Sequence, residues 1–136
     1  MRDPLLNYPG YSLRRASNAM MGELAQRLTA LDLRMADATV LMLIETNPKI
    51  TASRIGRALD IQRANMVPLL KRLEETGLVE RAPIDGKSLG LSLTAAGSER
   101  LAEARDTIDT FEAELLARVP EVHREHLLPA LDALWR

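Results

Sequence analysis

The sequence predicts a mainly α-helical fold with a small two-stranded β wing, a winged helix-turn-helix domain with N- and C-terminal dimerisation helices. Apolar residues recur at steps of three and four through most of the chain, as one buried face of a helix requires. Between residues 78 and 93 the pattern changes to two short runs on either side of Asp85-Gly86, which is a hairpin signal. The length of 136 residues, with 46% apolar residues, suits a single domain with a hydrophobic core.

Two helices are predicted before the central motif, over residues 13–31 and 37–46. The second is apolar nearly all round from Val40 to Ile44, so we expect it to be the central buried helix. Asn47-Pro48 ends it. The first helix has a single apolar face, formed by Leu13, Ala16, Met20, Leu24, Leu28 and Leu31.

A short helix, a tight turn and a second helix follow, which is the order of a helix-turn-helix. Thr51 stands at the N-cap of the short helix, and residues 60–62 form the turn. The second helix covers residues 63–76, and Gly77 suits the left-handed position after its end. We expect the inner faces of both helices to consist of Ile55, Ala58, Leu59, Met66, Leu69, Leu70 and Leu73.

The predicted wing has strands at residues 78–81 and 89–93, joined by residues 83–88. Thr94 caps a long helix that ends before Pro120, and a last helix runs to the C-terminus. The apolar seams of these two helices are Leu101, Ala104, Ile108, Phe111 and Leu115, then Leu127, Leu128, Leu131, Leu134 and Trp135.

These seams exceed what one small winged domain can cover, so we expect a homodimer. Residues 1–136 are interpreted as a single domain, in which about 36–97 form the winged helix-turn-helix part. The dimerisation helices are assigned to residues 8–33 and 98–136, with contacts through Leu115, Leu127, Leu131 and Trp135.

The net charge of −1 is unevenly distributed. From Arg54 to Arg72 there are five basic residues and one acid, for +4, whereas Glu99 to Asp132 holds nine acids and four arginines, for −5. The basic segment predicts a surface that faces a polyanion, although ordinary scatter of charge is an alternative interpretation.

The second helix of a helix-turn-helix enters the major groove of DNA with its first residues near base edges. Here that helix opens with Gln62, Arg63, Ala64 and Asn65. An Arg side chain pairs well with guanine, and an Asn or Gln side chain pairs well with adenine. Lys71 and Arg72 suit phosphates. The full set of predicted DNA contacts is Thr51, Arg54, Gln62, Arg63, Ala64, Asn65, Pro68, Lys71, Arg72, Asp85, Lys87 and Ser88.

Residues 50–97, ITASRIGRALDIQRANMVPLLKRLEETGLVERAPIDGKSLGLSLTAAG, resemble the core of the MarR family of transcriptional regulators. The resemblance extends more loosely over almost the whole chain. It implies a triangular dimer that binds a pseudo-palindromic operator in double-stranded DNA and represses transcription. It also implies release by a small aromatic or phenolic effector, for which Tyr11, Arg14, Arg15 and Met42 are the candidate residues.

Two residues depart from the family pattern. The family wing usually has Asp-x-Arg, whereas this chain has Asp85-Gly86-Lys87, and Lys reads the shape of a groove less well than Arg. Pro68 lies inside the recognition helix, where it removes one backbone hydrogen bond and can introduce a kink.

The sequence also bears on several other functions. Cysteine is absent, so disulfides and cysteine-ligated zinc are excluded. His123 and His126 stand three residues apart, so a zinc site is an alternative to a surface helix of mixed charge. No catalytic constellation is recognisable, so we expect neither an enzyme nor a cofactor. A winged helix used for protein–protein contact is the main alternative. With no long apolar run, we expect no membrane partner and a cytoplasmic location.

Overall fold

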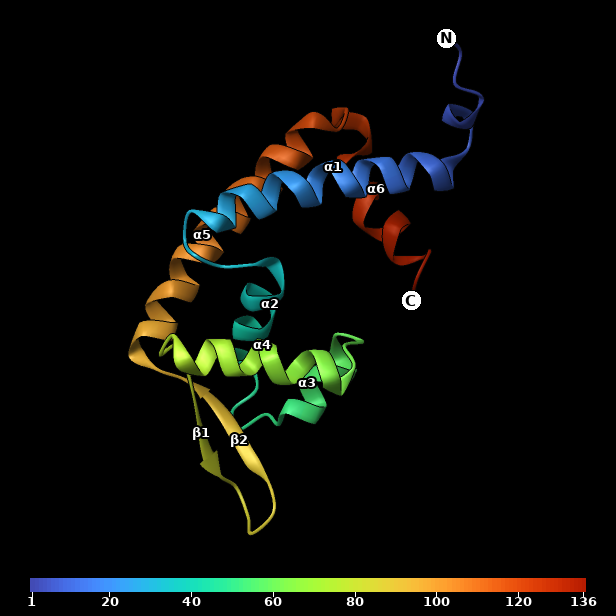
Figure 1. The fold of residues 1–136 in the computed structure, drawn as a ribbon. Helices are drawn as coiled ribbons and strands as arrows, with labels where there is room; N and C mark the ends of the chain where they lie inside the picture. The colour runs from blue at the N-terminus through green and yellow to red at the C-terminus, as the bar shows by residue number, and fades with distance from the viewer.

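The computed structural model describes all 136 residues and confirms the predicted fold class: six α helices and one two-stranded sheet (Figure 1). A short 3-10 helix, η1 (Pro4–Asn7), precedes them. The elements follow in the order α1 (Pro9–Thr29), α2 (Met35–Thr46), α3 (Ala52–Ala58), α4 (Arg63–Glu75), β1 (Val79–Pro83), β2 (Leu89–Leu93), α5 (Ala95–Arg118) and α6 (Glu121–Asp132). None of the helices is both long and apolar enough to cross a membrane.

The molecule has two parts. In Figure 1, α2, α3, α4 and the β hairpin form a winged part, and α1 with the second half of α5 and α6 extends from it as an arm. Both termini lie at the far end of the arm, away from the hairpin. Helix α6 of this arm has no buried residue, so the single chain leaves its apolar side chains without a covering partner.

The hydrophobic core is centred on α2, as the sequence predicts. Val40, Leu41 and Ile44 of this helix are at most 3% exposed, and they pack with residues from α1, α4 and α5. One buried cluster of 18 apolar residues joins the winged part to the base of the arm. The winged part and the arm of one chain are thus packed into a single folding unit around α2.

Helices α1 and α2 begin earlier than predicted. Helix α1 starts at Pro9, whose ring suits the first helical position because no partner is needed there for its missing N–H. Helix α2 starts at Met35, and the Asp37 carboxylate accepts a hydrogen bond of 2.7 Å from the backbone N–H of Arg34. Asp37 is therefore a capping residue inside the first turn, not the first residue of the helix as the periodicity indicated.

The helix caps and turns predicted from single residues are confirmed. The Thr51 hydroxyl accepts a hydrogen bond from Arg54 N–H at 3.3 Å, and the Thr94 hydroxyl accepts one from Gly97 N–H at 3.0 Å. Gly77 adopts a φ of 77°, the left-handed conformation that ends α4 and turns the chain into β1. These signals are local, which explains why the sequence alone reveals them.

The predicted inner face of α3 is wrong at Ala58, which is exposed. Gly56 takes the inward place instead, together with the buried Ile55. A Cβ on Gly56 would lie 2.9 Å from the backbone oxygen of Ile61 and 3.3 Å from the Met66 side chain. Helix α3 therefore approaches the turn and α4 more closely than a side chain at position 56 would allow.

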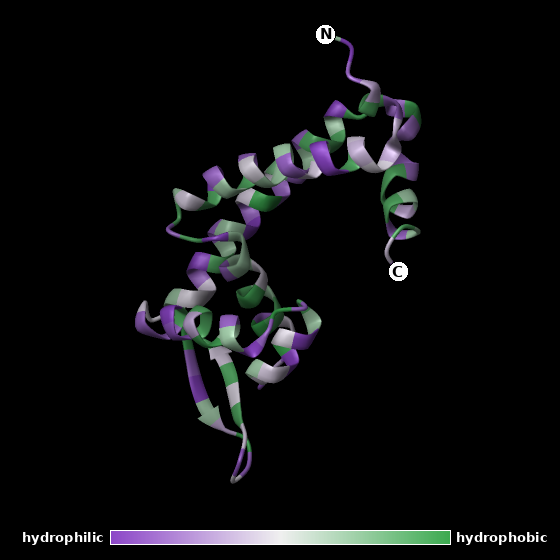
Figure 2. Cartoon of the chain, turned by 45° about the vertical axis from the view of Figure 1, so that its right-hand side comes forward, coloured by the Kyte–Doolittle hydropathy of each residue, from purple (hydrophilic) through white to green (hydrophobic).

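The last helix also ends earlier than predicted. Helix α6 stops at Asp132, so Leu134 and Trp135 lie in the turns after it. Helix α6 has no buried residue, and Leu128, Leu134 and Trp135 are 67%, 69% and 72% exposed. Figure 2 shows hydrophobic colour along this terminal segment, at the open end of the arm.

Gly97 is expected to be essential for stability. A Cβ at this position would overlap the backbone carbonyl of Leu78, where α5 crosses the start of β1. Gly97→Ala should lower the free energy of unfolding by at least about 2 kcal/mol, because the backbones must separate. Gly86→Ala is the control: no atom lies within 4 Å of that Cβ and the site is exposed, so the stability should change by no more than about 0.5 kcal/mol. Urea unfolding measures both; equal stabilities would contradict the close approach.

Candidate nucleic-acid interface

Helix α4 presents a buried face and an exposed first turn. Met66, Leu70 and Leu73 are at most 3% exposed and fix the helix against the core. Gln62, Arg63, Ala64 and Asn65 are exposed, as is Pro68 one turn later. The helix is continuous through Pro68 from Arg63 to Glu75, so the proline does not end it. The predicted inward and outward faces of this helix are confirmed except at Arg72.

The wing is an antiparallel hairpin in which Val79 pairs with Leu93 and Pro83 with Leu89. At its tip, one oxygen of the Asp85 carboxylate accepts hydrogen bonds of 2.9 Å from the backbone N–H groups of Lys87 and Ser88. The same two bonds lower the pKa of Asp85, because they stabilise its charged form. Asp85 thus shapes the turn and holds Lys87 and Ser88 at the tip.

A groove of about 890 Å³ lies between α3, the first half of α4 and the wing. It brings together several of the predicted residues, which are Thr51, Gln62, Arg63, Lys87 and Ser88. It also includes Arg57 and Arg81, which were absent from the predicted site. Arg57 lies three residues after Arg54, a spacing that places both on one face of α3 and was available in the sequence.

The 18 basic residues divide into those that are paired with a carboxylate and those that are not. Seven form ion pairs with carboxylates, namely Arg27, Lys71, Arg72, Arg81, Arg105, Arg118 and Arg136. In the helix-turn-helix and wing, five others have no such partner, namely Lys49, Arg54, Arg57, Arg63 and Lys87. Six more without such a partner lie elsewhere in the chain, namely Arg2, Arg14, Arg15, Arg34, Arg100 and Arg124. Three of the five in the winged part, Arg57, Arg63 and Lys87, line the groove together.

Arg72 is placed differently from the prediction. Its guanidinium pairs with the carboxylate of Asp37, which is fully buried, and its side chain is only 32% exposed. Lys71 beside it is 72% exposed, and its ammonium lies 3.8 Å from a Glu75 carboxylate oxygen. The periodicity places both residues near the outer face, but Arg72 turns towards α2 and is not available to a phosphate in this arrangement.

The candidate effector residues do not all come together in one chain. Tyr11 donates a hydrogen bond of 3.2 Å to Asp3 and accepts one of 2.9 Å from Arg15. The guanidinium carbons of Arg14 and Arg15 lie 5.6 Å and 5.8 Å from the centre of the Tyr11 ring. Met42 packs against the core from α2, whereas Tyr11 is the third residue of α1, and α1 begins near the far end of the arm (Figure 1).

Comparison with known proteins agrees with this geometry. The sequence profile of the MarR family matches residues 31–88 of this chain. The transcriptional repressor CouR, solved bound to a 23-mer DNA duplex, has 31% sequence identity to this chain, and the two structures superpose with a TM-score of 0.91. That similarity covers 100% of this chain and 99% of the CouR chain. The chain belongs to the MarR family.

One further relative and a second structure of CouR agree with a role in the regulation of transcription. A putative transcriptional regulatory protein for the hcr operon of Thauera aromatica is 28% identical, over 93% of this chain and 78% of its own length. CouR bound to p-coumaroyl-CoA is 30% identical with a TM-score of 0.88, over 100% of this chain and 97% of the other. The predicted function, regulation of transcription by a MarR-family protein, is thereby confirmed.

Proposed function

We propose that this MarR-family protein is a homodimeric repressor that binds a pseudo-palindromic operator through α4 and the wing. The observation that carries the proposal is the groove between α3, α4 and the wing, where Arg57, Arg63 and Lys87, none of them paired with a carboxylate, lie beside the exposed first turn of α4. Full-length similarity to a repressor that was solved with DNA supports it. Asn65, Arg63 and Gln62 are assigned to base edges, and Arg54, Lys71 and Lys87 to the backbone or groove.

The dimer is proposed to form through the arm, with residues 8–33 and 98–136 as the dimerisation helices and about 36–97 as the DNA-binding part. Helix α6 buries no residue in the single chain, and Leu115, Leu127 and Leu131 are only half-buried. Trp135 and Leu128 are mostly exposed. An apolar surface of this kind is stable in water when a second copy covers it.

DNA binding is expected to depend steeply on salt, which tests the role of Lys71. Wild-type protein should select a palindromic duplex from a random library, and its affinity for that duplex is then measured over a range of salt concentrations. Lys71→Ala should reduce the log–log salt slope by nearly 2 for the dimer, because each lost phosphate contact removes about 0.9. The weak, exposed pair with Glu75 does not prevent such a contact.

Arg2→Ala is the control, since it removes a cation near the N-terminus, at the far end of the arm and outside the proposed dimerisation helices. Its slope should equal that of the wild type. An unchanged slope in Lys71→Ala would remove Lys71 from the contacts. Failure of the wild type to select any duplex would favour the protein–protein alternative.

The effector is proposed to be an aromatic acyl-CoA thioester that releases the operator. This class is suggested by the relative that was solved with p-coumaroyl-CoA. Tyr11 with Arg14 and Arg15 suits such a ligand, because guanidinium groups bind phosphates and an aromatic ring stacks on planar groups. Neither arginine has a carboxylate partner within ion-pair distance. The assignment of Met42 to this site stays a prediction.

Addition of p-coumaroyl-CoA is expected to release a fluorescent operator, whereas p-coumarate or CoA alone should act only at far higher concentrations. Arg14→Gln and Arg15→Gln should each raise the required concentration by about tenfold or more, because a charge-assisted hydrogen bond is lost. Arg124→Gln, which changes an arginine that donates to the backbone oxygens of Ala117 and Val119 at the end of α5, is the control. Release by free p-coumarate at equal concentration would contradict the thioester class.

A further inference from the structure

Asp37 is the one charged side chain that the fold buries completely. It is 0% exposed, and both of its oxygens are used. One accepts a hydrogen bond of 2.7 Å from Arg34 N–H at the start of α2, and the other accepts one from the Arg72 guanidinium of α4. No buried polar side-chain atom is left without a partner. The carboxylate therefore joins the first turn of α2 directly to the recognition helix.

Arg72 lies seven residues after Asn65 on the same helix, which is about 10 Å along its axis. Because α4 is continuous over this length, a shift at Arg72 is transmitted to the first turn. Helix α4 otherwise rests on the core through apolar side chains such as Leu70 and Leu73, and its Glu74 pairs with Arg81 of β1 in the wing, not with the arm. Apolar contacts are not directional, whereas a charge-assisted hydrogen bond fixes both distance and orientation.

The loop before Asp37 is in turn connected to the arm. Arg100 of α5 donates a hydrogen bond of 2.7 Å to the backbone oxygen of Leu31, in the loop between α1 and α2. Asp32 in that loop has a φ of 55°, which turns the chain sharply before Arg34. A continuous series of contacts thus runs from α5, through residues 31–34, to Asp37 and then to Arg72. We name this series the Asp37 joint.

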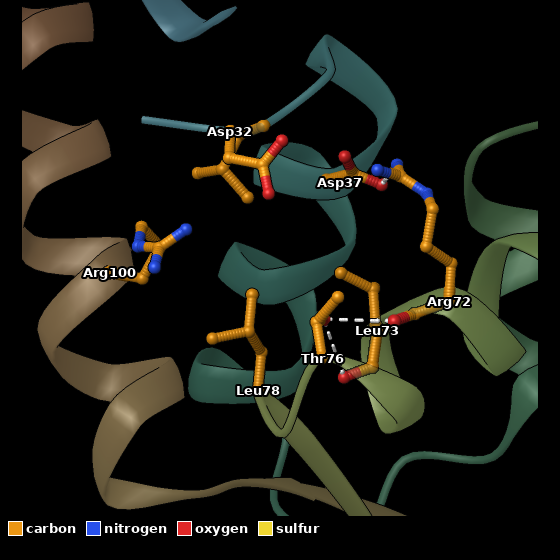
Figure 3. A pocket seen from close by; sticks show the side chains of 8 residues that line it. Asp32, Asp37, Arg72, Leu73, Thr76, Leu78 and Arg100 are labelled. Carbon is orange, nitrogen blue, oxygen red and sulfur yellow. Dashed lines mark hydrogen bonds and ion pairs between the residues drawn. The ribbon is translucent and has the colours of Figure 1, made fainter. Parts of the chain in front are cut away.

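The joint surrounds a cavity of about 240 Å³ (Figure 3). Asp32 and Arg100 line it on one side, and Asp37 with Arg72 on another. Leu33, Leu73 and Leu78 add apolar walls. The space beside the ion pair means that packing alone does not hold α4 against the loop at this point, so the polar contacts carry the connection.

We infer that the Asp37 joint sets the distance between the two recognition helices of the dimer and therefore its selectivity for the spacing of operator half-sites. This inference rests on the proposed function. In a two-fold dimer that distance depends on how each α4 is held relative to its own arm. Burial of an ion pair is weak evidence for stability but is consistent with a role in fixing one geometry. Asp37 and Arg72 are thus positioning residues that do not touch DNA.

The test uses the palindromic duplex that the wild type selects, and versions whose centre is one base pair longer or shorter. The measured quantity is the ratio of affinities for the original and altered spacing. Asp37→Asn and Arg72→Met should each reduce this ratio by about 2- to 30-fold. Substitutions that lie between two coupled sites, without touching either ligand, commonly change the coupling between those sites by factors of this size. Any unfolded fraction lowers all three affinities alike, so it cancels in the ratio.

Two comparisons make the result specific. The Asp37→Asn/Arg72→Met double variant should lose no more selectivity than either single variant, because both remove the same contact. Glu45→Gln removes another ion pair of α2, the half-exposed one with Arg105 of α5, and should leave the ratio unchanged. Additive losses in the double variant, an equal loss in Glu45→Gln, or unchanged ratios in both single variants would overturn the inference. Failure of the proposed function looks different, since the wild type would then select no palindromic duplex.

Discussion

Asn65→Ala is expected to weaken binding to the selected operator by between about 30-fold and about 10⁴-fold, and binding to random duplex hardly at all. A lost bidentate contact to a base costs about 1–3 kcal/mol per half-site, and a dimer has two half-sites. Asn65 is exposed in the first turn of α4, where Met66 and Leu70 anchor the helix and leave its amide directed outward. Titration of both duplexes at one fixed salt concentration measures the effect.

Lys87→Ala is the matched comparison for this experiment. Lys87 stands at the tip of the wing, where the Asp85 carboxylate holds its backbone N–H. A charge in this position contributes to binding of any duplex, so its removal should weaken operator and random DNA by similar factors. Equal losses for operator and random DNA in Asn65→Ala would withdraw Asn65 from base reading.

A double change at the end of the arm, Leu128→Asp with Trp135→Asp, is expected to produce a monomer. These side chains are 67% and 72% exposed in the single chain, so the substitutions should not disturb its core. In the dimer they would place charges in an apolar interface, which is strongly unfavourable. Operator affinity should fall by about 10²- to 10⁴-fold, because a monomer binds each half-site separately.

Sedimentation at micromolar concentration checks the mass directly. The wild type should show about twice the monomer mass of 15.1 kDa, and the double variant the monomer mass. Leu89→Asn is the control, since it changes an exposed apolar residue of the wing, far from the arm. A wild type that sediments as a monomer would contradict both the dimer and the palindromic operator.

Much of the fold could be predicted because its signals act over a few residues. Thr51 and Thr94 cap helices through atoms three residues away, and Gly77 ends α4 through its own φ. Asp85 closes the hairpin through N–H groups two and three residues later. Each of these interactions is complete within one turn, so the residue type and its place in the apolar pattern were sufficient.

In the candidate DNA-binding site, the sequence alone predicted which residues of α4 face outward. Helical periodicity correctly separates the buried Met66 and Leu70 from the exposed Gln62 and Asn65, because only burial of the apolar stripe decides which side faces out. Periodicity does not show how closely two helices approach. Gly56 faces inward and Ala58 outward because α3 lies against the turn at Ile61, which is a property of the packed pair.

The sequence by itself therefore determined the order of elements, the caps, the hairpin and the outward face of the recognition helix. Only the tertiary structure decided which charged side chains are engaged. Arg72 and Asp37 are 35 residues apart, and nothing local distinguishes Arg72 from its neighbour Lys71. A long flexible cation takes whatever partner the packing of helices brings within reach, and here the packing of α4 on α2 brings Arg72, not Lys71, to a buried carboxylate.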